Sequence, residues 1–204
     1  IEGYITEGLL KVKTRGEKNP FLIGIPFIWC SNNLVSAAIT QYRLLNNSEY
    51  LEVETALRDW LFGCNPWGKC MVIGLPKEGN YPLDPHSALA TNYGYKLTGG
   101  LVDGPVYESI FGRLKGIKLY HGDEYAQLQP NYVVYHDDYG DYSSNEPTLD
   151  GTAGLAYYFS YLQKKGEELK SKNNKLELNR GAIIRGDVNK KNIYLIFSAH
   201  EFAD

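Results

Sequence analysis

The stretch YHDDYGDYSSNEPTLDGTA, residues 135–153, is the most informative part of this sequence. Five carboxylates precede a segment with helical periodicity: Asp137, Asp138, Asp141, Glu146 and Asp150. Such a cluster can be a solvated acidic turn at a helix N-terminus, where carboxylates are favoured. It can be a calcium site, although the EF-hand spacing and its glycine are absent. It can also supply a catalytic carboxylate flanked by aromatic residues, as glycoside hydrolysis requires.

Helical periodicity dominates the chain on both sides of a long central segment. Apolar residues recur at three- and four-residue spacing, which predicts helices over residues 1–13, 28–46, 49–62 and 150–165. Ser48 is a suitable N-cap for the third of these helices, and Asp150 for the fourth.

The central segment, residues 64–147, shows no sustained helical period. It contains 11 of the 21 glycines and 7 of the 9 prolines, so it predicts loops. It also contains 10 of the 17 tyrosines, which argues against disorder. Because ordered loops of this length are usually functional, we expect this segment to carry the site.

Composition and charge exclude several classes of protein. The 204 residues carry 21 basic and 24 acidic side chains, a net charge of −3, so no basic face is available for nucleic acid. No apolar run approaches about 18 residues, so no membrane span is predicted. The three cysteines show no zinc-ligand spacing, and no metal ligands or cofactor are predicted. Tyrosine has an apolar face and a polar edge that suit either sugar binding or an aromatic core.

The 135–153 stretch resembles the second signature of glycoside hydrolase family 9, which includes cellulases and related glucanases. That signature has aromatic residues, an aspartate, a glutamate and small residues at fixed spacing. The positions in register are Tyr135, Asp137, Tyr142, Glu146, Thr148 and Ala153. The sequence departs from the signature at Thr152, where the family has asparagine.

Further segments resemble the same family over residues 1–165. The family's Pro-His-x-Arg turn corresponds to Pro85, His86 and then Ala88 in place of arginine. The segment GGLVDGPV resembles the family's glycine-rich loop, with Asp103 in place of a glycine. The segment WCSNN, residues 29–33, resembles the start of the helix before these loops.

The resemblance implies an all-α fold, the C-terminal part of an (α/α)6 barrel with long ordered loops, plus a short C-terminal strand. We expect residues 1–166 to form this part of the barrel and residues 167–181 to be a charged linker. Residues 182–204 then hold a strand at 193–197. The final IYLIFSAHEFAD resembles the first strand of a polysaccharide deacetylase-like domain; the alternative is a strand that packs on the barrel.

The family reaction is inverting hydrolysis of β-1,4-linked glycans. The resemblance makes Glu146 the general acid, has His86 bind a sugar hydroxyl, and has Asp137 position the loop or Glu146. It offers Trp67, Tyr135 and Tyr142 as substrate-binding platforms. The family's base lies in an Asp-Ala-Gly-Asp motif that is absent here. We therefore expect the remaining N-terminal part of the barrel as a partner, and no activity from these 204 residues alone.

Other assignments stay open at this stage. The alternative substrate is a glucosamine-containing glycan, because Ala88 and Asp103 alter the expected pocket. A non-catalytic carbohydrate-binding fragment is the other alternative. No cofactor is expected, although a structural calcium ion is compatible with the carboxylates. Because glycan polymers lie outside the cytosol, the resemblance implies a secreted or periplasmic protein that acts on a polysaccharide or oligosaccharide.

Overall fold

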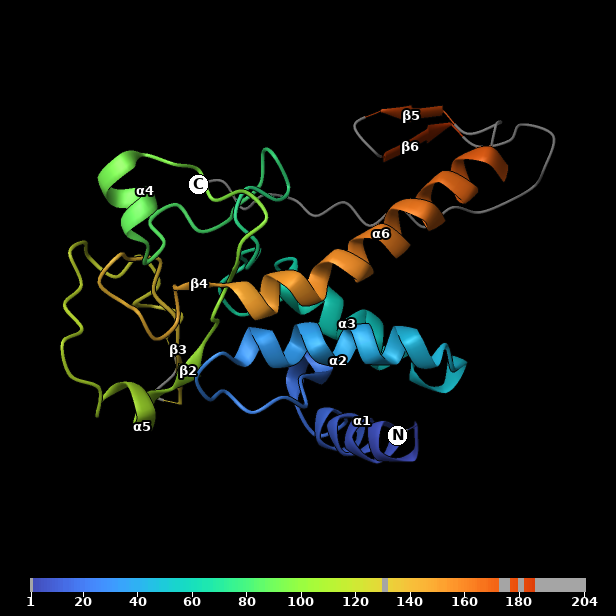
Figure 1. Cartoon of the computed structure of the whole chain (residues 1–204), viewed down its shortest axis with the longest axis horizontal. Coiled ribbons are helices and arrows are strands. Elements are labelled where there is room, and N and C mark those ends of the chain that lie inside the picture. Colours follow the sequence, from blue (N-terminus) through green and yellow to red (C-terminus); the bar gives the residue numbers. More distant parts are fainter. Residues whose placement is uncertain (1, 130–131, 173–176, 180–181, 186–204) are drawn as a thin grey trace. The chain divides into compact units, whose positions relative to one another are not determined.

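A computed structural model describes residues 2–129, 132–172, 177–179 and 182–185 of the chain (Figure 1). The chain divides into two compact units, Ile1–Phe159 and Ser160–Asp204. The first unit contains the helices and loops that concern the site. In the second, strands β5 (Glu177–Asn179) and β6 (Ala182–Arg185) pair antiparallel.

All four predicted helices are present. They are α1 (Glu2–Gly16), α2 (Ser31–Leu45), α3 (Leu51–Leu61) and α6 (Leu149–Lys172). The expected linker from residue 167 is wrong at its start, because α6 continues to Lys172. The strand predicted at 193–197, and with it the deacetylase resemblance, lies outside the described residues.

The two predicted helix caps are also corrected. A short 3-10 turn, η2 (Ser48–Tyr50), precedes α3, and the side chain of Asn47 rather than Ser48 accepts the Glu49 N–H at 3.0 Å. Asp150 lies inside the first turn of α6, where it accepts a hydrogen bond from the side chain of Asn33 at 2.9 Å. Asp150 therefore does not cap α6. It stabilises the helix because a negative charge is favoured in the first turn.

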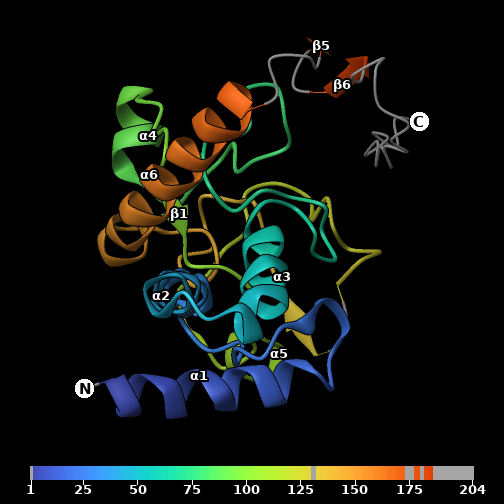
Figure 2. The ribbon, with the colours of Figure 1, turned by 90° about the vertical axis from the view of Figure 1, so that its right-hand side faces the viewer.

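The helices of the first unit pack around α2. Figure 2 shows α2 nearly end-on, with α1 below it and α3 beside it. Buried Ile39 of α2 and Leu57 of α3 belong to this core. Tyr42 of α2 donates its hydroxyl to the Leu9 carbonyl of α1 at 2.6 Å, which ties these helices together.

Helix α6 approaches α2 closely because of its glycines. The Ser36 hydroxyl of α2 donates to the Gly151 carbonyl at 2.9 Å, and the Thr40 hydroxyl donates to the Gly154 carbonyl at 3.0 Å. A β-carbon at Gly154 would lie 2.7 Å from the Ser36 hydroxyl oxygen, which is closer than any real contact. The start of α6, and the loop before it, is thereby held against α2.

The segment between α3 and α6 is loop-rich, as predicted. It contains the short helices α4 (Ala88–Tyr93) and α5 (Glu108–Phe111). Strand β1 (Leu101–Val102) pairs antiparallel with β4 (Pro147–Thr148), and β2 (Val106–Tyr107) pairs with β3 (Val133–Val134). The remaining short element is a 3-10 turn, η1 (Pro20–Leu22), between α1 and α2. The β1–β4 pair places Asp103 beside Glu146, with the Asp103 N–H donating to the Glu146 carbonyl at 2.9 Å.

Candidate active site

Glu146 lies in a pocket at the end of the 135–146 loop. We name this the Glu146 pocket; its volume is about 650 Å³. The Glu146 side chain is exposed, and among the described residues it has no hydrogen-bond or ion-pair partner. The pocket is lined by residues of α4 and the turn before it, the loop before β1, the 135–146 loop, β4 and the start of α6. These residues are His86, Ser87, Ala88, Leu89, Leu97, Thr98, Gly100, Tyr139, Glu146, Pro147, Thr148, Leu149 and Thr152.

His86 lines the same pocket in a fixed orientation. Its backbone N–H donates to the Asn145 carbonyl at 2.9 Å, directly before Glu146. Its ring stacks on Tyr139 with centroids 5.1 Å apart, and its Nδ1 bonds the Tyr139 carbonyl. Because a carbonyl oxygen only accepts, Nδ1 carries the proton, and in the neutral ring Nε2 remains as an acceptor.

An aromatic row continues from His86 past Tyr142 to Trp29. The rings of His86 and Tyr142 are 6.1 Å apart, and those of Tyr142 and Trp29 are 5.6 Å apart. Tyr142 is half-buried, and its hydroxyl donates to the Lys115 carbonyl at 2.8 Å. Trp29 keeps 46% of its surface exposed. The sequence analysis did not predict Trp29 as a site residue. Its position two residues before α2, within the WCSNN segment, could have indicated it.

Asp137 is buried and holds the loop. Its carboxylate forms an ion pair with buried Lys69 and accepts the backbone N–H groups of Leu83 and Asp84 at 2.8 and 3.0 Å. It also accepts the side-chain amide of Asn145 at 3.1 Å. Asp137 therefore does not line the Glu146 pocket, and its contacts fit the positioning role that we predicted rather than direct contact with substrate.

Asp138 and Asp141 have the same kind of structural use. Asp138 accepts backbone N–H groups of Tyr120 and His121, both at 2.8 Å. Asp141 is wholly buried between His136 and two serines. Burial raises the pKa of Asp141, but hydrogen bonds from His136, Ser143 and Ser144 lower it by more, so its pKa lies below the ordinary value.

The prediction of stacking platforms is wrong for Trp67 and Tyr135. Tyr135 has no exposed surface, and its hydroxyl donates to the Asn145 side chain at 2.9 Å. Trp67 is 4% exposed and bonds Gln129 at 3.1 Å through its indole nitrogen. Both side chains are buried and bonded to protein groups, and neither lines the Glu146 pocket. Tyr142 does not line it either, but its ring contacts that of His86, which does.

The departures from the signature have different consequences. Ala88 lines the Glu146 pocket, so the missing arginine changes the surface that a ligand meets. Thr152 accepts the Leu101 N–H at 3.0 Å and donates to the Thr148 carbonyl at 2.5 Å, so it ties β1 to α6. Asp103 is 1% exposed and does not line the pocket, which corrects the expectation that it reshapes the pocket.

The described residues contain neither a cluster suited to a metal ion nor a helix that could span a membrane. Over that part of the chain, no three His, Cys, Asp or Glu side chains are placed together to hold a metal ion. None of the helices described there is both long and apolar enough to cross a bilayer.

Comparison with known proteins gives one consistent family. The model of glycosyl hydrolase family 9 matches residues 5–159. A metagenome-derived family 9 endoglucanase structure is 28% identical, with a TM-score of 0.59, over 77% of this chain and 27% of its own. No curated protein matches the chain.

Two further solved structures share the fold. A thermostable endoglucanase from Alicyclobacillus acidocaldarius is 23% identical, with a TM-score of 0.59, over 79% of this chain and 30% of its own. A family 9 protein from Bacteroides ovatus is 22% identical, with a TM-score of 0.54, over 76% of this chain and 26% of its own. The chain therefore spans less than a third of each of these proteins.

Proposed function

The chain belongs to glycosyl hydrolase family 9, and on that premise we propose that it supplies the acid-bearing part of an enzyme that hydrolyses β-1,4-linked glucans. One observation carries the proposal. Of the five carboxylates in the signature stretch, Glu146 alone lines the pocket, whereas the side chains of Asp137, Asp138 and Asp141 are buried and bonded to the protein. Glu146 is thus placed to exchange a proton with a bound ligand.

The proposed reaction is inverting hydrolysis. Glu146 donates its proton to the glycosidic oxygen as the bond from that oxygen to the anomeric carbon breaks. A water molecule attacks the anomeric carbon from the opposite face and loses a proton to a carboxylate base. The absence of the Asp-Ala-Gly-Asp motif leads us to place that base outside these 204 residues, on the remaining N-terminal part of the barrel.

His86 and the aromatic row bind the sugar in this proposal. The His86 ring is held by Tyr139, so its Nε2 can accept a hydrogen bond from a sugar hydroxyl. Trp29 and Tyr142 offer ring faces beside the pocket, and such faces suit the C–H surface of a pyranose. Substrate polymers of this kind lie outside the cytosol, so we propose a secreted or periplasmic protein.

The test measures release of reducing ends from soluble β-1,4-glucan and from chitosan. The enzyme is this chain extended to a complete barrel, compared with its Glu146→Gln variant. We expect the variant to lose 10²- to 10⁴-fold in kcat, because the proton donor is removed while the shape is kept. Preference for chitosan would move the substrate to a glucosamine-containing glycan, for which the missing arginine at Ala88 is the motivating feature.

The matched control is Asp150→Asn. Asp150 is an exposed carboxylate four residues from Glu146, it does not line the pocket, and asparagine can still accept from Asn33. Its activity should stay within about twofold of the parent. Equal activity of parent and Glu146→Gln would reject Glu146 as the acid. Sugar binding without hydrolysis in the complete barrel would favour the carbohydrate-binding module.

A further inference from the structure

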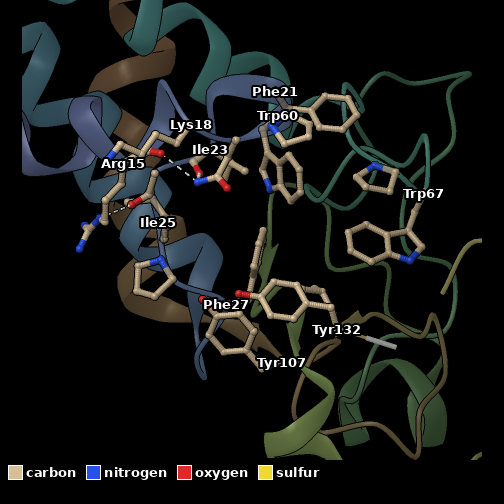
Figure 3. Close-up of a pocket in the computed structure, with 16 residues that line it drawn as sticks. Arg15, Lys18, Phe21, Ile23, Ile25, Phe27, Trp60, Trp67, Tyr107 and Tyr132 are labelled. Atoms are coloured by element: carbon tan, nitrogen blue, oxygen red, sulfur yellow. Dashed lines mark hydrogen bonds between the residues drawn. The ribbon is translucent and has the colours of Figure 1, made fainter. Parts of the chain in front are cut away.

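A second pocket lies apart from the Glu146 pocket. We name it the aromatic pocket; its volume is about 480 Å³, and it shares no lining residue with the Glu146 pocket (Figure 3). It lies between the end of α1, the segment 18–27, the end of α3 and the β2–β3 pair. A cavity of this size fits a small organic ligand of two or three rings.

The aromatic pocket presents ring faces and few free polar groups. Trp60 contacts Phe21 and Phe27 with ring centroids 5.7 and 5.6 Å apart. The indole nitrogen of Trp67 donates to Gln129 at 3.1 Å, so its polar edge is already used. Figure 3 shows Trp60, Phe27 and Tyr132 among the side chains that surround the pocket.

Two further tyrosines line the pocket, and the side-chain amide of the lining is occupied. The rings of Tyr107 and Tyr132 meet edge to face, with centroids 5.1 Å apart. The side-chain amide nitrogen of Asn19 donates to the Arg15 and Ile23 carbonyls at 2.9 and 3.2 Å. A sugar would therefore find few partners for its hydroxyls, and unpaired polar groups are costly to bury. An apolar planar body suits this lining better.

Positive charge lies at one end of the aromatic pocket. Arg15 and Lys18, at the end of α1, both line it, and the lining contains no carboxylate. Neither forms an ion pair with a described residue; Arg15 donates its Nε to the Gly24 carbonyl at 2.9 Å, which leaves its terminal nitrogens available. An anionic group at this end would gain charge-assisted hydrogen bonds.

The lip of the pocket is held in a strained conformation. Phe21 and Leu22 have φ angles of 61° and 53°, in the left-handed region that costs free energy for residues other than glycine. Gly24 allows the close packing that holds this segment, because a β-carbon there would lie 1.8 Å from the Val12 carbonyl oxygen. The packing around this segment holds Phe21 in that conformation, in which its ring meets Trp60 edge to face.

We propose that the aromatic pocket binds a planar aromatic carboxylate, with its rings against the exposed side chains of Phe21 and Tyr132 and its carboxylate toward Arg15 and Lys18. Aromatic faces, used polar edges and unpaired cations at one end together define this ligand class. The site is independent of the proposed hydrolysis.

The test compares two probes of the same ring system by isothermal titration calorimetry on the full chain. The probes are 2-naphthoate, which is anionic, and 2-naphthalenemethanol, which is neutral. We expect naphthoate to bind at least fivefold more tightly, and its advantage to shrink as salt rises from 20 to 200 mM. Equal affinities, or no heat from either probe at millimolar concentration, would overturn the proposal.

Variants locate the binding. Lys18→Met should weaken naphthoate binding at least threefold and leave the neutral probe unchanged. Tyr132→Ala, at an exposed position that leaves the core intact, should weaken both probes. The control is Lys11→Met, which removes an exposed cation from α1 outside the pocket and should change neither affinity. Similar effects of the two lysine variants, or no effect of Tyr132→Ala, would reject the site.

Two further measurements separate this site from the hydrolase proposal. Glu146→Gln should leave naphthoate binding unchanged, and cellotetraose should not displace the probe. Displacement by cellotetraose would mean that the aromatic pocket belongs to the glycan site, and would overturn the assignment to an aromatic carboxylate.

Discussion

Asp103 illustrates how burial controls a single carboxyl group. One of its oxygens accepts the indole N–H of Trp29 at 3.3 Å, and the other is buried without a partner in the described residues. Burial is the main cause that raises the pKa of Asp103 to about 7. The Cys30 thiol lowers this pKa by its hydrogen bond, and the nearby Glu146 carboxylate raises it. The folded protein thus retains this proton to unusually high pH.

The raised pKa predicts a pH-dependent stability. The folded-state pKa of Asp103 lies above the ordinary value of 3.8, so the group's contribution is complete below about pH 4 and is lost as the pH rises toward 7. Asp103→Asn keeps the shape without the ionisation. The parent loses stability over this range and the variant does not. The unfolding free energy of the variant minus that of the parent should therefore increase by roughly 2–3 kcal/mol from pH 5 to pH 8. Urea unfolding at both pH values measures this, with exposed Glu78→Gln as the control that should show no such gain.

At the scale of an element, the 135–146 loop is held by carboxylates that accept backbone N–H groups. Asp137 contacts the segment before His86, and Asp138 contacts the segment at Tyr120 and His121. Because these bonds join parts of the chain far apart in sequence, they fix the loop that ends at Glu146. Three of the four carboxylates in this loop, Asp137, Asp138 and Asp141, therefore have a structural role.

Lys69 allows a matched test of this element, because it pairs with one buried and one exposed carboxylate. Asp137 is the buried partner, and Glu124 is the exposed partner at 3.3 Å. Asp137→Asn should cost roughly 2–4 kcal/mol of unfolding free energy, because a buried ammonium loses its main counter-charge. Glu124→Gln should cost at most about 1 kcal/mol. Chemical denaturation of both variants provides the measurement; equal losses would show that the buried pair does not hold the loop.

At the scale of the whole molecule, the helices of the first unit leave large apolar side chains exposed. Leu149, at the start of α6, is 91% exposed, and Tyr4 of α1 is 87% exposed. Others on these helices and on α2 are Leu10, Leu34 and Tyr157. Apolar side chains this exposed are available to another chain segment or protein that packs on them. In our proposal the remaining part of the barrel covers it.

The incomplete barrel predicts the behaviour of the 204 residues by themselves. They should release no reducing ends from β-1,4-glucan, because our proposal places the base outside them, and they should self-associate through the exposed apolar surface. Adding the N-terminal part of the barrel as a separate chain should disperse the association and restore turnover. Sedimentation velocity measures the self-association, and a reducing-sugar assay measures the turnover. Sustained hydrolysis by the chain alone would contradict this prediction.

The sequence by itself determined the helices and the loop-rich centre, and it supplies the prediction that Glu146 is the acid. Periodicity places apolar side chains on one face of a helix whatever lies around it, so α1, α2, α3 and α6 were predictable. The spacing of Glu146 within the signature needs no tertiary information either. The cap at Asn47 was missed because several neighbouring polar residues can cap equally well, and only the local backbone selects one.

Only the tertiary structure decided which aromatic and acidic side chains lie at the Glu146 pocket and which are buried. Tyr135 and Tyr142 match the signature equally well, yet one is wholly buried and the other lies between His86 and Trp29. Burial depends on contacts between residues far apart in the chain, and no local pattern encodes them. The aromatic pocket has the same origin, because α1, α3 and the β2–β3 pair meet only in the folded chain.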